Sequence, residues 1–369
     1  MADAQRHPVV PETHRAVTRA DVARLAGVSS AVVSYVVNDG PRPVAAATAE
    51  RVREAMELLG YRPNASARAL RTGTTETVGL VLGDSRNPFF TEYTFELVKA
   101  AAARGKQLLI GDAQRGRFDE ADIVDTLISR QVDGVLLATA RGRSDPRITA
   151  RVAAVPTVLI NCPAAVPGRR TVGSAARAGA QRLIAHLIDH GRRRVALVMG
   201  DEGFGDPDPR ESGWLMAHVE AGLAPGPMVR TPFTRAGGYS ATVQLLDESP
   251  TVDAIFASND LQAIGVLRAL HERGRSIPDD IAVVAFDGTV ESEFAWPPLT
   301  VARQNLPAMA AASFDLLGAE IPRSGRHVEI PTELILRSSC GCPVPDPMTT
   351  RPPRGRDGAE PAPGKESRE

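Results

Sequence analysis

Small polar side chains are predicted to line one face of a short helix over residues 29–38. An apolar face at helical spacing is formed by Val32, Val33, Val36 and Val37. The opposite face carries Ser30, Ala31, Ser34, Tyr35 and Asn38. Hydroxyl and amide groups on a helix of this kind can hydrogen-bond to phosphates and base edges in the major groove of DNA.

The segment before this helix predicts a partner helix and a tight turn. Thr18 can cap a helix with Asp21 in a capping box, Gly27 breaks that helix, and Ser29 caps the next one. Two short helices joined in this way indicate a helix-turn-helix, with a further helix over 48–59 that ends at Gly60. The alternative is an ordinary helical hairpin in a larger core, which the small outward residues disfavour.

Length and charge set the limits of the interpretation. The chain has 369 residues and a net charge of −1, which suggests two or three domains and by itself indicates no partner. Residues 18–72 contain eight arginines against five acidic residues, a local charge of +3. A modest basic excess of this kind suits a DNA-binding segment, and it would double in a dimer.

The central part of the chain alternates strand-like and helix-like runs. Short apolar runs occur at 77–83, 107–111, 134–138, 158–160, 195–199, 254–257 and 282–285. Helical patterns lie between them at 95–104, 120–129, 180–190 and 261–273. This rhythm predicts parallel sheets covered on both faces, and the length of residues 74–339 predicts two doubly wound subdomains with a cleft between them.

Both ends of the chain read as disordered, and nothing indicates a membrane or an export signal. Residues 1–17 are polar with prolines, and residues 343–369 are Pro-rich and charged. No run is long and apolar enough to cross a bilayer, and the first residues lack the apolar stretch of a secretory signal. We therefore expect a cytoplasmic protein.

Chemistry beyond binding has little support in the sequence. The patterns G-x-S-x-G, H-E-x-x-H and the P-loop are absent, so we expect no enzyme and no cofactor. His186 and His190 are spaced i, i+4, and Cys340 and Cys342 form a C-x-C pair. Either pair could bind a metal, but we expect incidental thiols and no metal site.

A series of motifs in one order carries a resemblance to a known family. The motifs are DVARLAGVS, VSYVVND, LGYRPNASARAL, TVGLVLGDSRNPFF, RQVDGVLL, AIFASNDLQAIGVLRAL, IPDDIAVVAFDG, PPLTVARQ and PTELILR. From residue 18 to about 339, the chain resembles the lactose/galactose-repressor family of bacterial transcription regulators. The resemblance implies an all-α DNA-binding head (18–62), a hinge helix (63–73), and an α/β effector-binding and dimerisation domain (74–339) similar to periplasmic sugar-binding proteins.

The resemblance also implies how the effector domain is divided. Its chain crosses three times between the subdomains. We expect the first subdomain at about 76–162 plus 290–304, and the second at about 163–289 plus 305–339.

The resemblance assigns DNA contacts to the predicted second helix. It places Ser30, Ala31 and Tyr35 at base-facing positions, and Ser29, Ser34 and Asn38 at phosphate-contacting positions. Val32 stands where the family commonly has threonine, which removes one hydroxyl contact. Ala31 offers only apolar contact to a base edge.

The hinge sequence NASARALRT predicts a helix that is marginal by itself. Asn64 would cap it, and Ala67 and Leu70 would share one face. The resemblance implies that two copies form this helix on DNA and push Leu70 between base pairs, which opens the minor groove. A plain interdomain linker is the alternative.

Candidate ligand contacts follow the predicted strands, where doubly wound sheets bind their ligands. By position or by resemblance they are Asp84, Asn87, Phe89, Phe90, Asn161, Arg210, Phe233, Asn259 and Asp287. Other roles stay open: Asn259 could cap a helix, Phe89 or Phe90 could be core, and Arg210 could belong to an ion pair near Asp206 and Asp208. The stretch VGSAARAG lacks an aspartate that the family often has, which would change the effector.

These observations predict a homodimeric repressor that binds a palindromic operator and is controlled by a small molecule, a sugar. One alternative is a DNA-binding regulator of the same fold with a non-sugar effector or with none. The other is a small-molecule binding protein without DNA function, such as a transport receptor.

Overall fold

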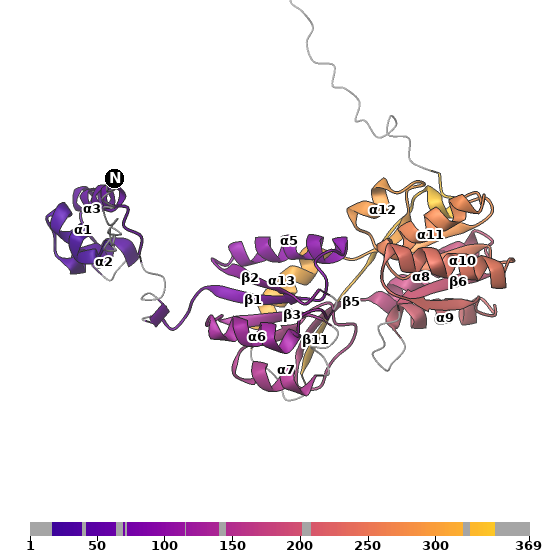
Figure 1. Cartoon of the computed structure of the whole chain (residues 1–369), viewed down its shortest axis with the longest axis horizontal. Coiled ribbons are helices and arrows are strands. Elements are labelled where there is room, and N and C mark those ends of the chain that lie inside the picture. Colours follow the sequence, from indigo (N-terminus) through magenta and orange to yellow (C-terminus); the bar gives the residue numbers. More distant parts are fainter. Residues whose placement is uncertain are drawn as a thin grey trace, which may run out of the picture. The chain divides into compact units, whose positions relative to one another are not determined.

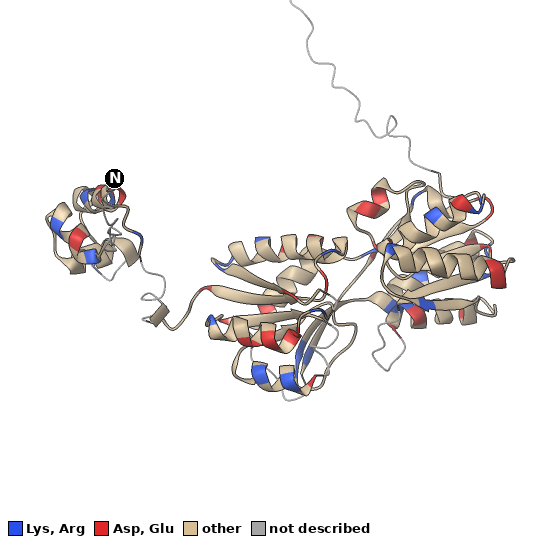
Figure 2. Cartoon of the chain, viewed as in Figure 1, with Lys and Arg blue, Asp and Glu red and all other residues tan. Residues whose placement is uncertain are grey.

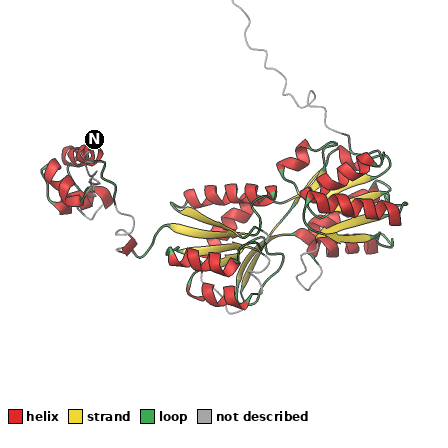
Figure 3. Ribbon diagram, in the orientation of Figure 1, coloured by secondary structure: helices red, strands yellow, loops and turns green. Residues whose placement is uncertain are grey.

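The computed structural model describes residues 17–38, 42–63, 69–70, 72–114, 116–139, 145–200, 208–319 and 325–343. The chain divides into two compact units, Met1–Thr75 and Glu76–Glu369, each shown in Figures 1 and 3. Apart from Val17 and Pro343, the predicted terminal arm and tail lie outside the described residues.

The first unit is a three-helix bundle of α1 (Arg19–Ala26), α2 (Ser30–Asn38) and α3 (Ala46–Leu59). Each helix places one fully buried valine in its core, Val22, Val33 and Val52. Gly60 ends α3 in the left-handed conformation, as predicted, whereas α3 begins before the predicted residue 48 and has no side-chain cap.

The second unit contains two six-stranded sheets, and parallel pairing dominates both. The first sheet has the order β11-β5-β4-β3-β1-β2, and the second has the order β12-β10-β9-β8-β6-β7. The pair β10–β12 is antiparallel. The first sheet consists of β1 (Thr77–Leu82), β2 (Gln107–Asp112), β3 (Gly134–Ala138), β4 (Thr157–Leu159), β5 (Arg170–Ser174) and β11 (Arg326–Ile330). The second consists of β6 (Val195–Gly200), β7 (Met228–Thr231), β8 (Ala254–Ala257), β9 (Ala282–Asp287), β10 (Thr300–Arg303) and β12 (Glu333–Ile335).

Helices cover both faces of each sheet, which confirms the predicted α/β class (Figure 3). The first sheet carries α5 (Pro88–Ala102) and α13 (Leu306–Leu317) on one face, and α6 (Glu120–Ser129), α7 (Pro146–Arg151) and η2 (Val152–Ala154) on the other. The second sheet lies between α10 (Arg235–Glu248) with α11 (Asp260–Glu272) and α8 (Ala176–Asp189) with α9 (Pro209–Glu220). Two short helices, α12 (Val290–Phe294) and η3 (Ser338–Cys340), complete the second subdomain.

The predicted division between the subdomains is wrong in three places. β5 pairs with β4 and β11 in the first sheet, although residues 163–289 were expected in the second subdomain. β10 pairs with β9 in the second sheet, although 290–304 were expected in the first subdomain. Residues 306–330 return to the first sheet, because α13 packs against α5 in one core and β11 pairs with β5. The three connections between the sheets therefore precede α8, α13 and β12.

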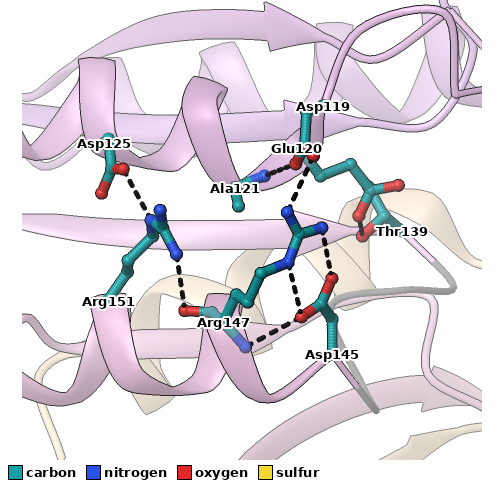
Figure 4. A network of polar contacts seen from close by, with 8 residues as sticks. All are labelled: Asp119, Glu120, Ala121, Asp125, Thr139, Asp145, Arg147 and Arg151. Atoms are coloured by element: carbon teal, nitrogen blue, oxygen red, sulfur yellow. Dashed lines mark hydrogen bonds and ion pairs between the residues drawn. The ribbon is translucent and has the colours of Figure 1, made fainter.

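An ion-pair network holds α7 against α6 on the first subdomain, as Figure 4 shows. Arg147 contacts both Asp119 (3.0 Å) and Asp145 (3.0 Å), and Arg151 contacts Asp125 (2.6 Å). Hydrogen bonds from Arg147 and from nearby backbone N–H groups hold the pKa values of Asp119 and Asp145 below their usual range. These partly exposed pairs link the two helices.

Acidic and basic residues are interspersed over both units (Figure 2). Among the described residues, no single helix is long and apolar enough to span a bilayer. In the same described ranges, α1 and α2 reach that length and apolarity only as a pair, and they are bent by 104° at their junction.

Candidate nucleic-acid interface and ligand site

The turn between α1 and α2 has helix-turn-helix geometry. The backbone N–H and the hydroxyl of Thr18 both donate to the carboxylate of Asp21, at 2.9 and 2.6 Å, which confirms the predicted cap of α1. These hydrogen bonds hold the pKa of Asp21 below its usual value. Gly27 adopts a φ of 67°, and the two helices meet at 104°. That angle lies within the range of about 90–120° at which DNA-binding motifs present their second helix.

The start of α2 exposes the residues that the sequence assigned to DNA. The hydroxyl of Ser29 accepts a hydrogen bond from the Val32 N–H at 3.3 Å, as predicted for a cap, and Ser30 and Ala31 are exposed. Tyr35 lies half-buried one turn further along.

Ser34 and Asn38 are engaged with each other on the same helix. The Asn38 amide donates to the Ser34 carbonyl at 2.9 Å and approaches its hydroxyl at 3.3 Å. Both side chains are half-buried, so a phosphate contact would compete with this local pairing.

The hinge segment exposes one large apolar side chain. Ala69, Leu70 and Thr72 are helical, and the Gly73 N–H donates to the Ala69 carbonyl at 2.8 Å. Leu70 is 91% exposed, more than any other large hydrophobic side chain in the described part of the chain. The predicted cap and partner residues, Asn64 and Ala67, lie outside the described residues.

Arg210 is the centre of a polar cluster at the carboxyl ends of the second sheet's strands. Its guanidinium pairs with Asp208 at 2.8 Å and donates to the Ser258 carbonyl at 2.6 Å. The rings of Phe233 and Phe286 lie 5.2 and 5.8 Å from the guanidinium carbon. Burial favours the neutral form of Asp208, but Arg210 outweighs it and lowers the pKa of that carboxyl. Arg210 is thus held as a fixed, planar cation beside two aromatic faces.

Two buried carboxyl groups extend the cluster, since Asp287 lies near Arg210 and Asp260 lies near Asp287. Asp287 ends β9 with a φ of 104° and is 8% exposed; burial raises its pKa to about 7, partly opposed by Arg210 and by a hydrogen bond from Gln304. Asp260 accepts from the backbone and hydroxyl of Thr289, at 2.6 and 2.7 Å. Burial, and then the neighbouring Asp287, raise the pKa of Asp260 well above its usual value.

This region also contains buried acceptors that no hydrogen bond satisfies. The second carboxylate oxygen of Asp260 (Oδ1), which Thr289 does not contact, is buried without a hydrogen-bond donor. The amide oxygen of Gln304 (Oε1) is buried in the same way. Gln304 uses its amide nitrogen to donate to Asp287 at 2.8 Å. Buried acceptors of this kind are satisfied by hydroxyl donors or water, which is the chemistry of a polyhydroxylated ligand.

Several predicted ligand residues have structural duties instead. Asn259 and Asn87 cap α11 and α5, because their side-chain oxygens accept the N–H groups of Gln262 (2.8 Å) and Phe89 (3.1 Å). Phe89 is 3% exposed within the first subdomain's core, which corrects the prediction that it contacts ligand. Phe90 is half-buried against the same core.

The remaining candidates follow strands of both sheets. Asp84, after β1, pairs with Arg86 at 2.9 Å. Asn161, after β4, is exposed with a φ of 52°. Phe233, after β7, packs over the end of β6, where a side chain on Gly200 would lie 1.9 Å from its ring.

Sequence reasoning did not select Asp260, Gln304 and Phe286 as ligand candidates, and it named Asp208 only as a possible ion-pair neighbour of Arg210, which the structure confirms. Each lies at or just after the end of a strand or before a helix, the same signal that selected Asp287. Their selection required the order of strands in the sheet, which places the ends of β8, β9 and β10 side by side.

Two family models match the chain. Residues 18–64 match the model described as bacterial regulatory proteins, lacI family, and residues 184–340 match the periplasmic binding protein-like domain. The HTH-type transcriptional regulator GalR of Escherichia coli K12 is 34% identical over 301 residues, which cover 80% of this chain and 87% of that protein.

Solved structures agree with these matches. A lac repressor dimer bound to operator and the anti-inducer ONPF aligns with a TM-score of 0.78 at 25% identity, over 88% of this chain and 99% of that one. A complex of the transcriptional regulator CelR with cellobiose aligns with a TM-score of 0.64 at 30% identity and the same coverage.

Proposed function

Because the chain belongs to the lacI family of bacterial regulatory proteins, we propose that it is a homodimeric transcriptional repressor whose affinity for a palindromic operator is set by a sugar. The observation that carries DNA binding is the first unit itself, in which α2 leaves α1 at 104° with an exposed start. The observation that carries effector control is the buried cluster around Arg210.

Base reading is assigned to the exposed end of α2. Ser30 can donate to or accept from a base edge, Ala31 can contact a thymine methyl, and the Tyr35 phenol can reach further along the groove. Ser29, Ser34 and Asn38 fix the register through phosphates. The modest basic charge of the unit requires two copies for useful affinity, hence a palindromic site.

The hinge supplies the second part of DNA recognition. An apolar side chain as exposed as Leu70 is unfavourable in water, and the centre of an operator offers it a place between base pairs. The helix that carries it is short, so a second copy and DNA are needed to stabilise it.

A dimer face is supported by the first subdomain. β2 is an edge strand, and β2 and the neighbouring α5 expose Phe95 (64%), Val98 (46%), Leu109 (38%) and Ile110 (47%). An edge strand beside exposed apolar side chains is a surface that needs a partner. A second copy of the same surface gives a two-fold interface and places two hinges on one operator.

The sugar is recognised by planar and buried groups. Arg210 can donate two parallel hydrogen bonds to paired hydroxyls, and Phe233 can face a sugar ring. Asp287 can accept hydrogen bonds from the hydroxyl groups of the sugar. Asp287, with its pKa raised to about 7, can also bind as the neutral acid and donate. A non-sugar ligand with several hydroxyl groups would use the same contacts.

A single contact supports coupling between the subdomains. The Val290 N–H, at the start of α12, donates to the Glu92 carboxylate of α5 at 2.9 Å. Glu92 also raises the pKa of Asp287. A ligand that binds Asp287 therefore acts beside the contact that joins α12 to α5, and shifts an equilibrium between two subdomain arrangements. Coupling of about 1–3 kcal/mol is typical of such switches.

Operator selection from random duplexes, followed by anisotropy titration of the full-length protein, tests the proposal. Leu70→Ala should weaken operator binding by about tenfold to a hundredfold, because the central wedge is lost. Leu58→Ala is the matched control, since Leu58 is also exposed (80%) but lies on α3. Equal affinities of the two variants, or no preference for palindromes, would contradict the DNA part.

A thermal-shift panel of sugars and nucleosides tests the effector part. We expect a subset of sugars to raise the unfolding temperature and to change operator affinity. If no compound does either, sugar control is contradicted, and a regulator of the same fold with a non-sugar effector or with none is favoured.

A further inference from the structure

The structure brings together two pairs of residues that lie far apart in the sequence. His186 is in the last turn of α8 and His190 directly follows that helix, while Cys340 ends η3 and Cys342 comes two residues later. The Cys342 sulfur lies 3.5 Å from His186 Nε2 and 3.6 Å from His190 Nε2. The Cys340 sulfur lies 3.3 Å from His186 Nε2.

These separations match those of a tetrahedral zinc site. Zinc binds thiolate at about 2.3 Å and imidazole at about 2.0–2.1 Å, so a sulfur and a nitrogen on one tetrahedral ion lie about 3.6 Å apart. The separations of the Cys342 sulfur from the two histidines, 3.5 and 3.6 Å, lie close to that value, and the Cys340 sulfur lies 3.3 Å from His186 Nε2. Ligand atoms of His186, His190 and Cys342 all lie within 4.8 Å of one another, which leaves room for one ion between them.

The backbone of the C-terminal segment is built to present the two thiols. The Ser339 hydroxyl donates to the Val283 carbonyl at 2.6 Å and accepts from the Thr300 N–H at 2.8 Å, so η3 is fixed to the starts of β9 and β10. Gly341 has a φ of 101°, a conformation that favours glycine and that turns Cys342 back toward α8.

The four side chains differ in access to solvent in a way that suits metal entry. Cys340 is buried and its sulfur accepts a hydrogen bond from the Thr300 hydroxyl at 3.0 Å. Cys342 and His186 are half-buried, and His190 is exposed. An ion can therefore enter from the side of His190 and Cys342.

We propose that His186, His190 and Cys342 bind one Zn²⁺ ion, and that the Cys340 sulfur, which lies beside His186 but outside this group of three, turns toward the ion as the fourth ligand. Two imidazoles and two thiols form the Cys₂His₂ donor set typical of structural zinc. The ion would join the end of α8 to the C-terminal segment, which are about 150 residues apart, and so stabilise the second subdomain.

The site is distinct from the proposed sugar site. α8 leads into the start of β6, and η3 contacts the starts of β9 and β10. The sugar cluster lies at the opposite, carboxyl ends of these strands. Zinc binding is therefore independent of both the operator and the effector.

Metal analysis of the full-length protein tests the proposal directly. The chain is purified with its affinity tag removed, under mild reductant and without chelator, and its zinc content is measured by mass spectrometry. We expect one zinc per chain. Replacement by Co²⁺ should give the intense visible bands of a tetrahedral ion and a sulfur-to-cobalt charge-transfer band, which report thiolate ligation.

Single substitutions assign the ligands. Cys342→Ser and His190→Gln should each lose the stoichiometric zinc and the charge-transfer intensity that depends on it. The matched controls are Cys162→Ser, in the first subdomain's core, and His271→Gln, exposed at the end of α11; both should keep one zinc.

A measurement on the unmodified chain keeps the test decisive if a variant fails to fold. Zinc removal by a chelator should lower the unfolding temperature by several degrees and expose Cys342 to a thiol reagent. Protein that contains no zinc and does not bind Co²⁺, or whose mass shows a disulfide between Cys340 and Cys342 under the same reductant, would overturn the proposal.

Discussion

The two edges of the second sheet place polar groups in opposite ways. At the carboxyl edge, Arg210 and Asp208 are half-buried near the buried Asp287, and each has a charged neighbour. At the amino edge, His186, His190 and Cys342 are partly open, and their polar contacts are with one another and with Cys340. The charges at the carboxyl edge already balance one another, so a ligand there must replace existing contacts. At the amino edge, the nitrogen and sulfur lone pairs of the histidines and of Cys342 are available to a cation.

Because the polar groups are arranged differently at the two edges, the loss of one side chain should have different consequences for stability at each edge. Removal of one charge at the carboxyl edge leaves another charge buried and unpaired, which is costly. Removal of one donor at the amino edge leaves neutral groups near solvent and affects mainly the bound ion. Substitutions at the two edges should therefore differ in their effect on the stability of the folded chain.

The largest effect is expected from Arg210→Ala. Asp208 would lose its guanidinium partner while it stays largely buried, which should lower the free energy of unfolding by about 3 kcal/mol. Sugar affinity should fall by about a hundredfold or more, because the planar donor is lost. Urea unfolding and calorimetric titration with the most stabilising sugar of the panel measure the two losses.

Arg268→Ala is the control for this change. Arg268 pairs with Glu272 on the exposed side of α11, with 74% of its side chain accessible. The control should change neither stability nor sugar affinity measurably. If both arginine variants behave alike, the contrast between the edges is wrong.

A second effect concerns pH. The pKa of Asp287 is raised to about 7, mainly by burial, so the folded protein binds this proton more tightly than the unfolded chain. The stability that this bound proton gives the folded chain is complete at a pH below the pKa of Asp287 in the unfolded chain. It is lost as the pH rises through about 7, the pKa of Asp287 in the folded chain. We expect the free energy of unfolding to fall by about 2 kcal/mol between pH 5 and pH 7.

Asp287→Asn should reduce that dependence on pH, because the variant has no proton to lose at this position. Asp279→Asn, an exposed substitution before β9, should keep the full dependence. Urea midpoints at the two pH values make the comparison, and identical slopes in both variants would exclude Asp287 as the source.

Local signals in the sequence predicted the first unit well. Its helix ends are decided by residues within a few positions of one another. They are the Thr18–Asp21 cap of α1, the turn at Gly27, the Ser29 cap of α2 and the end of α3 at Gly60. Seven of the twelve strands, β1–β4, β6, β8 and β9, were also found, because most of them are buried parallel strands that read as short apolar runs. The other five, β5, β7, β10, β11 and β12, were not predicted.

Features that depend on long-range pairing could not be predicted. α13 and β10 were assigned to the wrong subdomains, since an apolar helix or strand fits either core equally well. Phe89 and Phe90 are adjacent, and only the angle of α5 decides that Phe89 is core. The two histidines and two cysteines were each noticed, but nothing in the sequence joins residue 186 to residue 342.

A smaller effect is expected from Phe233→Leu. The ring lies 5.2 Å from the Arg210 guanidinium, an interaction of about 0.5–1 kcal/mol, and leucine keeps the apolar volume without the ring's charge distribution. Sugar affinity should fall about threefold, with stability nearly unchanged. Phe118→Leu, on a loop of the first subdomain, is the control. A loss as large as that of Arg210→Ala would mean that Phe233 does more than orient the cation.

The smallest effect tests whether the two edges are independent. Phe233→Leu acts at the carboxyl edge and Cys342→Ser at the amino edge. Both side chains pack against one hydrophobic cluster, but within the described part of the chain they have no hydrogen-bond or ion-pair partner in common. Substitutions without shared partners combine additively within about 0.5 kcal/mol. The double variant should therefore bind sugar as Phe233→Leu does and lose zinc as Cys342→Ser does. Calorimetry with sugar, repeated before and after chelation, measures the coupling. A sugar affinity that changes with zinc occupancy would show that the sheet transmits binding from one edge to the other.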